Sequence, residues 1–169
     1  MSCLDRIIRV NQAGEYGATR IYAGQLAILK NSAIGDTLRE MEAQEQHHLK
    51  TFNNLAIEHS VSPTILQPIW HVGGYFLGAA TALLGEKAAH ACTIAVEEVI
   101  ADHYQSQLDQ LSDKEHPVLK NTIAQFRAEE IAHKDHAIAE GGLDAPGYEA
   151  ITAAVKFISK AAIWLSTRL

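Results

Sequence analysis

The sequence predicts an all-α protein: a four-helix bundle built from two helix-hairpin repeats, with an apolar connection and a C-terminal accessory helix. Three observations lead to this class. Strand-like alternation is nowhere sustained, glycine and proline divide the 169 residues into long segments of helical apolar spacing, and the two halves repeat one pattern of residues. A chain of this length suits one domain, so we expect residues 1–169 to fold together.

The first expected hairpin covers residues 4–58. Its first helix, residues 4–30, has an apolar face that includes Ile7, Ile8 and Ile21, and no proline interrupts it. After a turn, Thr37-x-x-Glu40 has the spacing of a capping box, in which two side chains satisfy the first free amides of a helix. We therefore expect the second helix to start there and to end near Glu58.

The apolar connection follows at residues 60–80, and no Asp, Glu, Lys or Arg occurs from Ser60 to Gly85. Pro63, Pro68 and Gly73-Gly74 interrupt its helical pattern. The second hairpin is expected at residues 81–140, with one helix from about Thr81 to Leu111, a turn at 112–117, and a stop at Gly141-Gly142. The accessory helix is expected at residues 147–167.

The two hairpins are repeats of each other. Aligning Glu15 with Glu97 also aligns Tyr22 with Tyr104 and Gln25 with Gln107. Each lone glutamate is followed by Glu-x-x-His, 30 residues later in the first half and 33 later in the second. The midpoint of each pair of glutamates falls beside or inside a predicted turn, which places the two glutamates of a hairpin at the same height.

These positions predict a site for two metal ions. Residues i and i+3 share a helix face, so two such hairpins bring four carboxylates and two imidazoles around one point. Burying the carboxylates costs several kcal/mol per ion unless cations neutralise them, and this ligand set suits iron or manganese better than zinc. It is the arrangement of ferritin-like carboxylate proteins. The predicted ligands are Glu15, Glu45, His48, Glu97, Glu130 and His133.

Neighbouring residues are weaker candidates. Glu98, Glu129 and His47 adjoin the ligands, but only Glu97 and Glu130 align with a counterpart, and His47 lies about 100° from His48 around the helix, facing away. His136, one turn beyond His133, could support a ligand from outside the metal centre. The alternative is that it lies on the surface or hydrogen-bonds in the core.

A second set of candidates lies close to Glu97 in the sequence. Tyr104 either hydrogen-bonds near the metals or, with Tyr22, is a core aromatic residue. Asp102 or another acid could orient a metal-bound histidine.

Four segments, which lie between residues 9 and 137 and contain all six predicted ligands, resemble the demethoxyubiquinone hydroxylases, the di-iron monooxygenases of late ubiquinone biosynthesis. They are RVNQAGEYGATRIYAGQL (9–26), MEAQEQHHL (41–49), AVEEVIADHYQSQL (95–108) and FRAEEIAHKDHA (126–137). The resemblance implies that the six ligands hold two Fe ions, and it includes the pair His103 and Tyr104, which we expect close to the metals.

The resemblance also implies a reaction. Dioxygen is the co-substrate, the ring of a polyprenyl demethoxy-benzoquinol is hydroxylated, and NADH is the expected electron source. No Gly-x-Gly-x-x-Gly unit occurs, so the sequence assigns no NADH-binding residues.

The partners and location follow from the substrate class. A single crossing by residues 60–85 would separate the two half-sites, so this segment is either buried in protein or lies on a membrane surface, and we favour the surface. We expect a peripheral protein on the cytoplasmic face of the bacterial inner membrane, or on the matrix side of the mitochondrial inner membrane. The N-terminal sequence predicts no signal peptide.

Other partners are less well defined by the sequence. Association with other ubiquinone-biosynthesis proteins and a homo-oligomer stay open, and the net charge of −6 argues against nucleic acid.

Two other functions fit the same ligands. A rubrerythrin-like di-iron peroxidase or oxidase would consume peroxide, but it would not need a long uncharged segment. A non-enzymatic role, as iron storage or as a quinone-binding assembly factor, would keep the bundle without the reaction.

Overall fold

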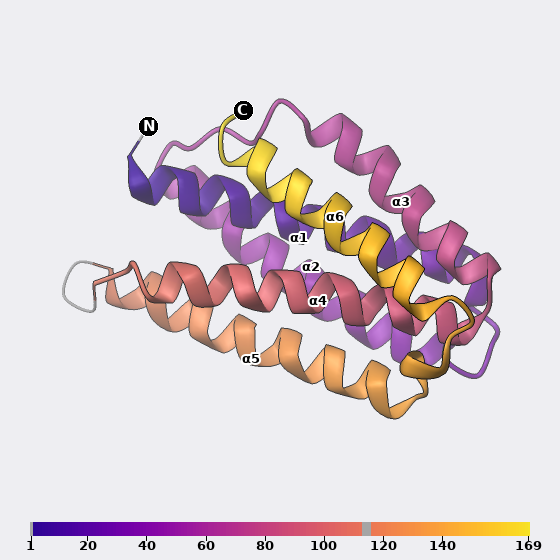
Figure 1. Cartoon of the computed structure of the whole chain (residues 1–169). Coiled ribbons are helices and arrows are strands. Elements are labelled where there is room, and N and C mark those ends of the chain that lie inside the picture. The colour runs from indigo at the N-terminus through magenta and orange to yellow at the C-terminus, as the bar shows by residue number, and fades with distance from the viewer. Residues whose placement is uncertain (1, 113–115) are drawn as a thin grey trace.

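Four long helices form the body of the molecule and lie side by side (Figure 1). The computed structural model describes residues 2–112 and 116–169, and within these ranges every regular element is a helix. The all-α prediction is therefore confirmed, and the arrangement is compatible with a ferritin-like bundle. The four helices are α1 (Cys3–Leu29), α2 (Gly35–Glu58), α4 (Glu86–Leu108) and α5 (Pro117–Ala139).

The core has an apolar cluster on each side of a polar layer. One cluster contains Phe52, Ile123 and Phe126, and the other contains Leu38 and Met41. Along α2, Leu38 and Met41 precede Glu45 and His48 and Phe52 follows them, so an apolar cluster lies on each side of the polar layer along the bundle axis. Water is thereby kept away from the layer on both sides.

The start of α2 differs from the predicted capping box. The helix begins at Gly35, its N-cap is Ile34, and no side chain caps it, so Thr37 and Glu40 lie inside the helix. A tight turn leads directly into α2, with the amide of Gly35 donating to the Ser32 carbonyl. A Cβ at position 35 would lie 2.5 Å from the Lys30 carbonyl oxygen, which is why the turn needs glycine there.

The apolar connection is itself mostly a helix, α3 (Gln67–Leu83), which the sequence analysis did not predict. Pro68 lies in its first turn, where proline is tolerated because the first amides of a helix have no intrahelical partner. The predicted helix start near Thr81 was wrong, since α3 continues past it. The break comes at Gly85, whose φ of +109° favours glycine, and α4 begins at Glu86.

Helix α3 lies on the outside of α1 rather than inside the bundle (Figure 1). The two backbones approach closely at glycines: a Cβ at Gly78 would lie 1.9 Å from the Ile21 carbonyl oxygen, and one at Gly24 would lie 2.1 Å from that of Tyr75. Only three residues of α3 are buried, so its outer face is exposed. Of the two readings of this segment, burial across the bundle is excluded.

The remaining predicted elements agree with the structure. Helix α5 ends at Ala139, before the short 3₁₀-helix η1 (Gly142–Asp144), and α6 (Tyr148–Ser166) packs mainly on α4. The predicted turn at 112–117 falls partly on residues 113–115, which lie outside the described residues.

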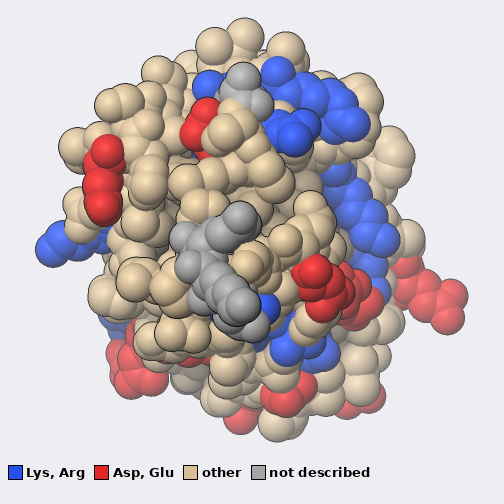
Figure 2. Space-filling view, turned by 90° about the vertical axis from the view of Figure 1, so that its left-hand side faces the viewer, with Lys and Arg blue, Asp and Glu red and all other residues tan. Residues whose placement is uncertain are grey.

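The surface combines charged and uncharged areas. The two ends of the chain lie at the same end of the bundle (Figure 1), and the face seen there carries basic and acidic side chains close to one another among uncharged ones (Figure 2). Among the described residues, no helix is both long and apolar enough to cross a membrane.

Candidate metal centre

The six predicted ligands meet in the centre of the bundle, although they come from four different helices. None is more than 4% exposed. Their donor atoms form two overlapping groups in which all atoms lie within 4.8 Å of one another. One group is Glu15, Glu45, His48 and Glu130, and the other is Glu45, Glu97, Glu130 and His133.

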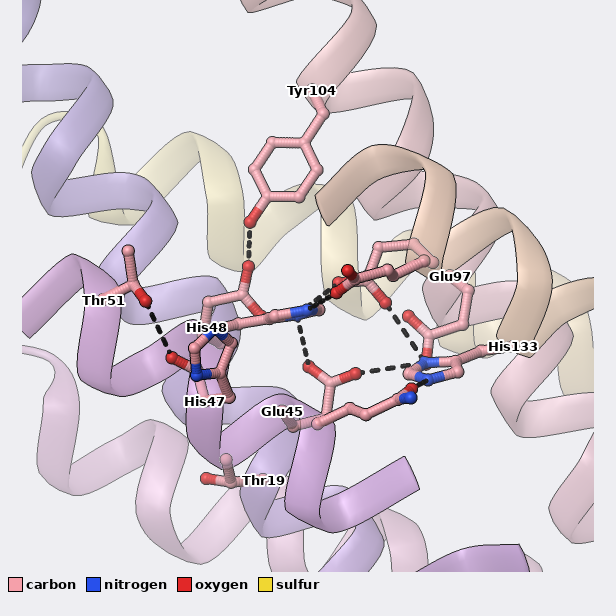
Figure 3. A network of polar contacts seen from close by, with 12 residues as sticks. Thr19, Glu45, His47, His48, Thr51, Glu97, Tyr104 and His133 are labelled. Carbon is pink, nitrogen blue, oxygen red and sulfur yellow. Dashed lines mark hydrogen bonds and ion pairs between the residues drawn. The ribbon is translucent and has the colours of Figure 1, made fainter. Parts of the chain in front are cut away.

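Glu45 and Glu130 belong to both groups and lie between the two histidines. The Nδ1 atom of His48 is 3.1 Å from Glu130 and 3.8 Å from Glu45, and the Nδ1 atom of His133 is 3.2 Å from Glu45 and 3.3 Å from Glu130. Figure 3 shows Glu45 reaching between the two rings. Each of these carboxylates could therefore bridge two ions, with Glu15 and Glu97 at the outer ends.

The donor set fits metal ions because each of its residues leaves a buried polar atom unpaired. Each of the six residues has at least one buried nitrogen or oxygen atom without a hydrogen bond. Unpaired buried polar atoms are rare and costly in folded proteins, and a cation would satisfy all of these at once. Oxygen and imidazole donors suit iron or manganese.

The site's electrostatics point the same way. Burial raises the pKa of the Glu97 and Glu15 carboxyls well above the usual value, and the neighbouring carboxylates add to the shift. Burial alone would lower the pKa of His48 and His133, but the adjacent carboxylates of the cluster raise the two pKa values to about 12 and about 10. Without metal, the cluster therefore retains protons, and metal binding must replace that positive charge.

Two tyrosines hydrogen-bond to the outer ligands in a reciprocal pattern. The Tyr22 hydroxyl of α1 donates to Glu97 of α4 at 2.6 Å, and the Tyr104 hydroxyl of α4 donates to Glu15 of α1 (Figure 3). Both rings are almost fully buried. The two sequence-based alternatives for these residues therefore hold together: they are core aromatics, and they orient predicted ligands.

The residues that orient the histidines were missed. The Nε2–H group of His48 donates to Glu129 at 2.6 Å, and that of His133 donates to the Gln44 carbonyl, which leaves each Nδ1 free to face the cluster. Glu129 was considered only as an alternative ligand. The signal that could have found both is their position, directly before the glutamate of each Glu-x-x-His.

The other neighbours lie outside the cluster. Asp102 is exposed, so it does not orient a ligand, and His47 is exposed and faces away as predicted. His136 is exposed beside the buried His90, and Glu98 pairs with Lys156 at 2.7 Å. None of these four contributes to either group of donor atoms.

His103 lies beside the centre, and none of its described hydrogen bonds goes to a predicted ligand. Its Nε2 is 2.7 Å from the Gln107 amide nitrogen, and Gln107 exchanges two hydrogen bonds with Asn11. Burial lowers the pKa of His103 to about 4, so the ring is neutral at physiological pH. It shares a narrow space with Glu15 and Tyr104.

An apolar pocket of about 230 Å³ leads toward this space. It lies between α1, α3, α4 and α6, and Val10, Gly14, Ile100 and Ile163 line both the pocket and the narrow space. Ile69 and Ile158 also line it and are 57% and 46% exposed, so the pocket opens at the surface between α3 and α6.

Comparison with known proteins identifies the family. Residues 2–166 match the family model described as "Ubiquinone biosynthesis protein COQ7". This chain belongs to the COQ7 family. A curated member from Rhodospirillum rubrum, named 3-demethoxyubiquinol 3-hydroxylase, is 53% identical over 98% of this chain and 78% of its own length.

Two eukaryotic members of the family, both named NADPH-dependent 3-demethoxyubiquinone 3-hydroxylase, mitochondrial, are also similar. The protein from Dictyostelium discoideum is 50% identical over 98% of this chain and 77% of its own length. The human protein is 45% identical over 99% of this chain and 79% of its own length. Their names specify NADPH where the sequence analysis expected NADH.

The unpaired carboxylates give a prediction for the metal-free protein. Replacing Glu97 by Gln removes a buried acid but keeps an acceptor for Tyr22. We expect the metal-free variant to be about 1–3 kcal/mol more stable than the metal-free wild type at pH 8. Denaturant unfolding with a chelator present measures this. Lower stability of the variant would show that the buried acid is not destabilising.

Proposed function

We propose that the chain is a di-iron monooxygenase that hydroxylates the ring of a polyprenyl demethoxy-benzoquinol with dioxygen in late ubiquinone biosynthesis. One observation carries the proposal: the buried centre of four carboxylates and two imidazoles adjoins an apolar pocket, in a chain of the COQ7 family. The curated relatives are named for hydroxylation of demethoxyubiquinone or demethoxyubiquinol.

Two irons, when bound, would supply the redox chemistry that activates dioxygen. Glu15, Glu45, His48, Glu97, Glu130 and His133 would hold them, and the four carboxylates would balance the charge of two Fe²⁺ ions. Tyr104 and Tyr22 hold the outer carboxylates in place through their hydroxyl groups. The apolar clusters on both sides keep bulk water out, which protects reactive oxygen species from side reactions.

The pocket between α3 and α6 would bind the substrate. Its apolar walls suit a quinol ring with a prenyl tail, and its inner end reaches the narrow space at Glu15, His103 and Tyr104. A ring entering from the surface would therefore approach the centre from the side of Glu15. The neutral His103 is placed to hydrogen-bond a ring oxygen there.

The balance of the reaction requires electrons from outside. One oxygen atom of O2 enters the ring as a hydroxyl group, and the other leaves as water with two further protons and two electrons. A reduced nicotinamide is the proposed donor, NADPH by the names of the relatives, and the chain has no Gly-x-Gly-x-x-Gly unit to bind it.

The surface around the pocket would rest on a membrane. Both helices that line the pocket also carry exposed apolar residues, among them Phe76 (66% exposed) on α3 and Phe157 (74%) and Trp164 (56%) on α6, each next in sequence to a lining residue. An apolar patch of this kind suits the headgroup boundary of a bilayer, from which a polyprenyl substrate can enter the pocket. The proposed location is therefore peripheral, at the inner membrane that contains the quinone.

One prediction of the proposed function concerns activity in cells. The intact gene should restore ubiquinone in a strain that lacks this hydroxylase and accumulates demethoxyubiquinone, whereas Glu97→Ala should not. His47→Ala is the matched control, because this neighbour of His48 points out of the centre. Quinone extracts separated by chromatography give the readout. Failure of the intact gene would contradict the function, and full rescue by Glu97→Ala would contradict the metal assignment.

A second prediction concerns the pocket. Ala162 on α6 lines it, whereas Ala153 on the same helix is exposed and does not. We expect Ala162→Phe to lower kcat/KM at least about tenfold through a raised KM, with unchanged metal content, because the ring fills the space of the substrate. Ala153→Phe should leave KM close to that of the wild type. Equal kinetics for both variants would place the substrate elsewhere.

A third prediction concerns the membrane. The wild-type protein should float with vesicles of anionic and neutral phospholipids in a density gradient without detergent. The double change Phe76→Glu and Phe157→Glu should leave most of the protein in the soluble fraction, because charged groups resist transfer into the headgroup boundary. Metal content is the control for folding. A wild-type protein that stays soluble would contradict the membrane contact.

A further inference from the structure

The hydrogen bonds behind the two histidines follow the internal repeat. Gln44 and Glu129 occupy equivalent positions, each directly before the glutamate of a Glu-x-x-His unit. Each residue reaches across to the histidine of the other half: Glu129 of α5 accepts from His48 of α2, and Gln44 of α2 accepts from His133 of α5. The placement of these two hydrogen bonds is therefore two-fold symmetric.

The chemistry at these two positions is not symmetric. His48 donates to a carboxylate, whose second oxygen accepts from the Gln125 side chain at 2.9 Å, whereas His133 donates to a neutral amide. The ligands themselves are identical in the two halves, and so are the tyrosines that hold Glu15 and Glu97. Among the described hydrogen bonds to the six predicted ligands, the two halves differ only in the charge of the group that accepts from the histidine: a carboxylate for His48 and a neutral amide for His133.

A carboxylate behind an imidazole makes the opposite nitrogen a stronger donor to a cation. The anion stabilises positive charge on the ring, and loss of such a partner typically weakens metal binding 10–100-fold. The Glu129 side chain is 32% exposed, but the oxygen that contacts His48 is 2.6 Å from a ring that is fully buried. The charge of Glu129 therefore acts on the His48 ring through a direct hydrogen bond, at a distance that leaves no room for water between them.

We propose that Glu129 makes the two metal positions unequal. The position of Glu15, Glu45, His48 and Glu130 binds its ion about tenfold or more tightly than the position of Glu45, Glu97, Glu130 and His133, and fills first. Glu129 and Gln44 are positioning residues, since they act through the histidines. The inference rests on the two-metal site of the proposed function and adds an order of loading to it.

The test is a titration of the metal-free full-length protein with Mn²⁺, with free Mn²⁺ followed by electron paramagnetic resonance. The wild type should bind two ions per chain with intrinsic dissociation constants that differ at least about tenfold. Glu129→Gln should weaken the tight position about tenfold, and Gln44→Glu should tighten the weak one by a similar factor. The variant with both changes should again have two different dissociation constants, and its tighter position should now be the one at His133.

Controls separate this effect from general changes in charge or folding. Glu58→Gln removes one negative charge from an exposed position at the end of α2 and should leave both constants unchanged. Circular dichroism and thermal unfolding of each metal-free variant report whether the bundle is intact. We expect helix content and unfolding temperature not to change in step with the dissociation constants.

The possible failures are distinguishable. Two ions of equal intrinsic affinity in the wild type, or constants unaffected by Glu129→Gln and Gln44→Glu, would overturn the inference and leave the two-metal site standing. A wild type that binds no Mn²⁺ would overturn both.

Discussion

The burial of four carboxylates and two imidazoles at one point is the constraint on which the rest of the structure depends. No apolar core tolerates this charge without neutralisation, and the cluster has neither solvent contact nor an arginine or lysine near its unpaired atoms among the described ion pairs. Retained protons reduce the charge of the metal-free cluster, and bound cations would also satisfy its unpaired donor atoms. The bundle is therefore best understood as a frame that keeps these six side chains together at the expense of metal-free stability.

The internal repeat explains how so few residues build the frame. Each hairpin supplies a lone glutamate, a Glu-x-x-His unit and a tyrosine, and the tyrosine of one half holds the lone glutamate of the other. The same reciprocity links Gln44 and Glu129 to the opposite histidines. Because every such contact crosses between the halves, the two hairpins can reach this geometry only when packed together.

The additional helices give the centre its surroundings. Helices α3 and α6 enclose the apolar pocket on the side of Glu15, and the Trp70 indole of α3 donates to Ser166 of α6 at 3.0 Å, which ties the two together. Their outer faces carry exposed apolar side chains. The helices that line the pocket are therefore also the ones whose outer faces we propose to contact a membrane.

The meeting of the six predicted ligands could be predicted because it depends on local rules: i, i+3 spacing fixes a helix face, and the position of a turn fixes the height along the bundle. The positions of Glu129 and Gln44 before each Glu-x-x-His mark them as candidates, but their pairing with the opposite histidines depends on how α2 and α5 are rotated toward each other. Helix α3 was missed for a related reason. Pro68 and the glycines indicate breaks in a sequence, but Pro68 begins the helix, and Gly78 allows the close contact with α1.

The most direct test of the central claim is the metal content of the purified protein, combined with anomalous scattering from its crystals. The account predicts two iron ions per chain, about 3.5–4 Å apart, between His48 and His133. A folded, active protein with no metal, with a single ion, or with its ions away from these two histidines would contradict it.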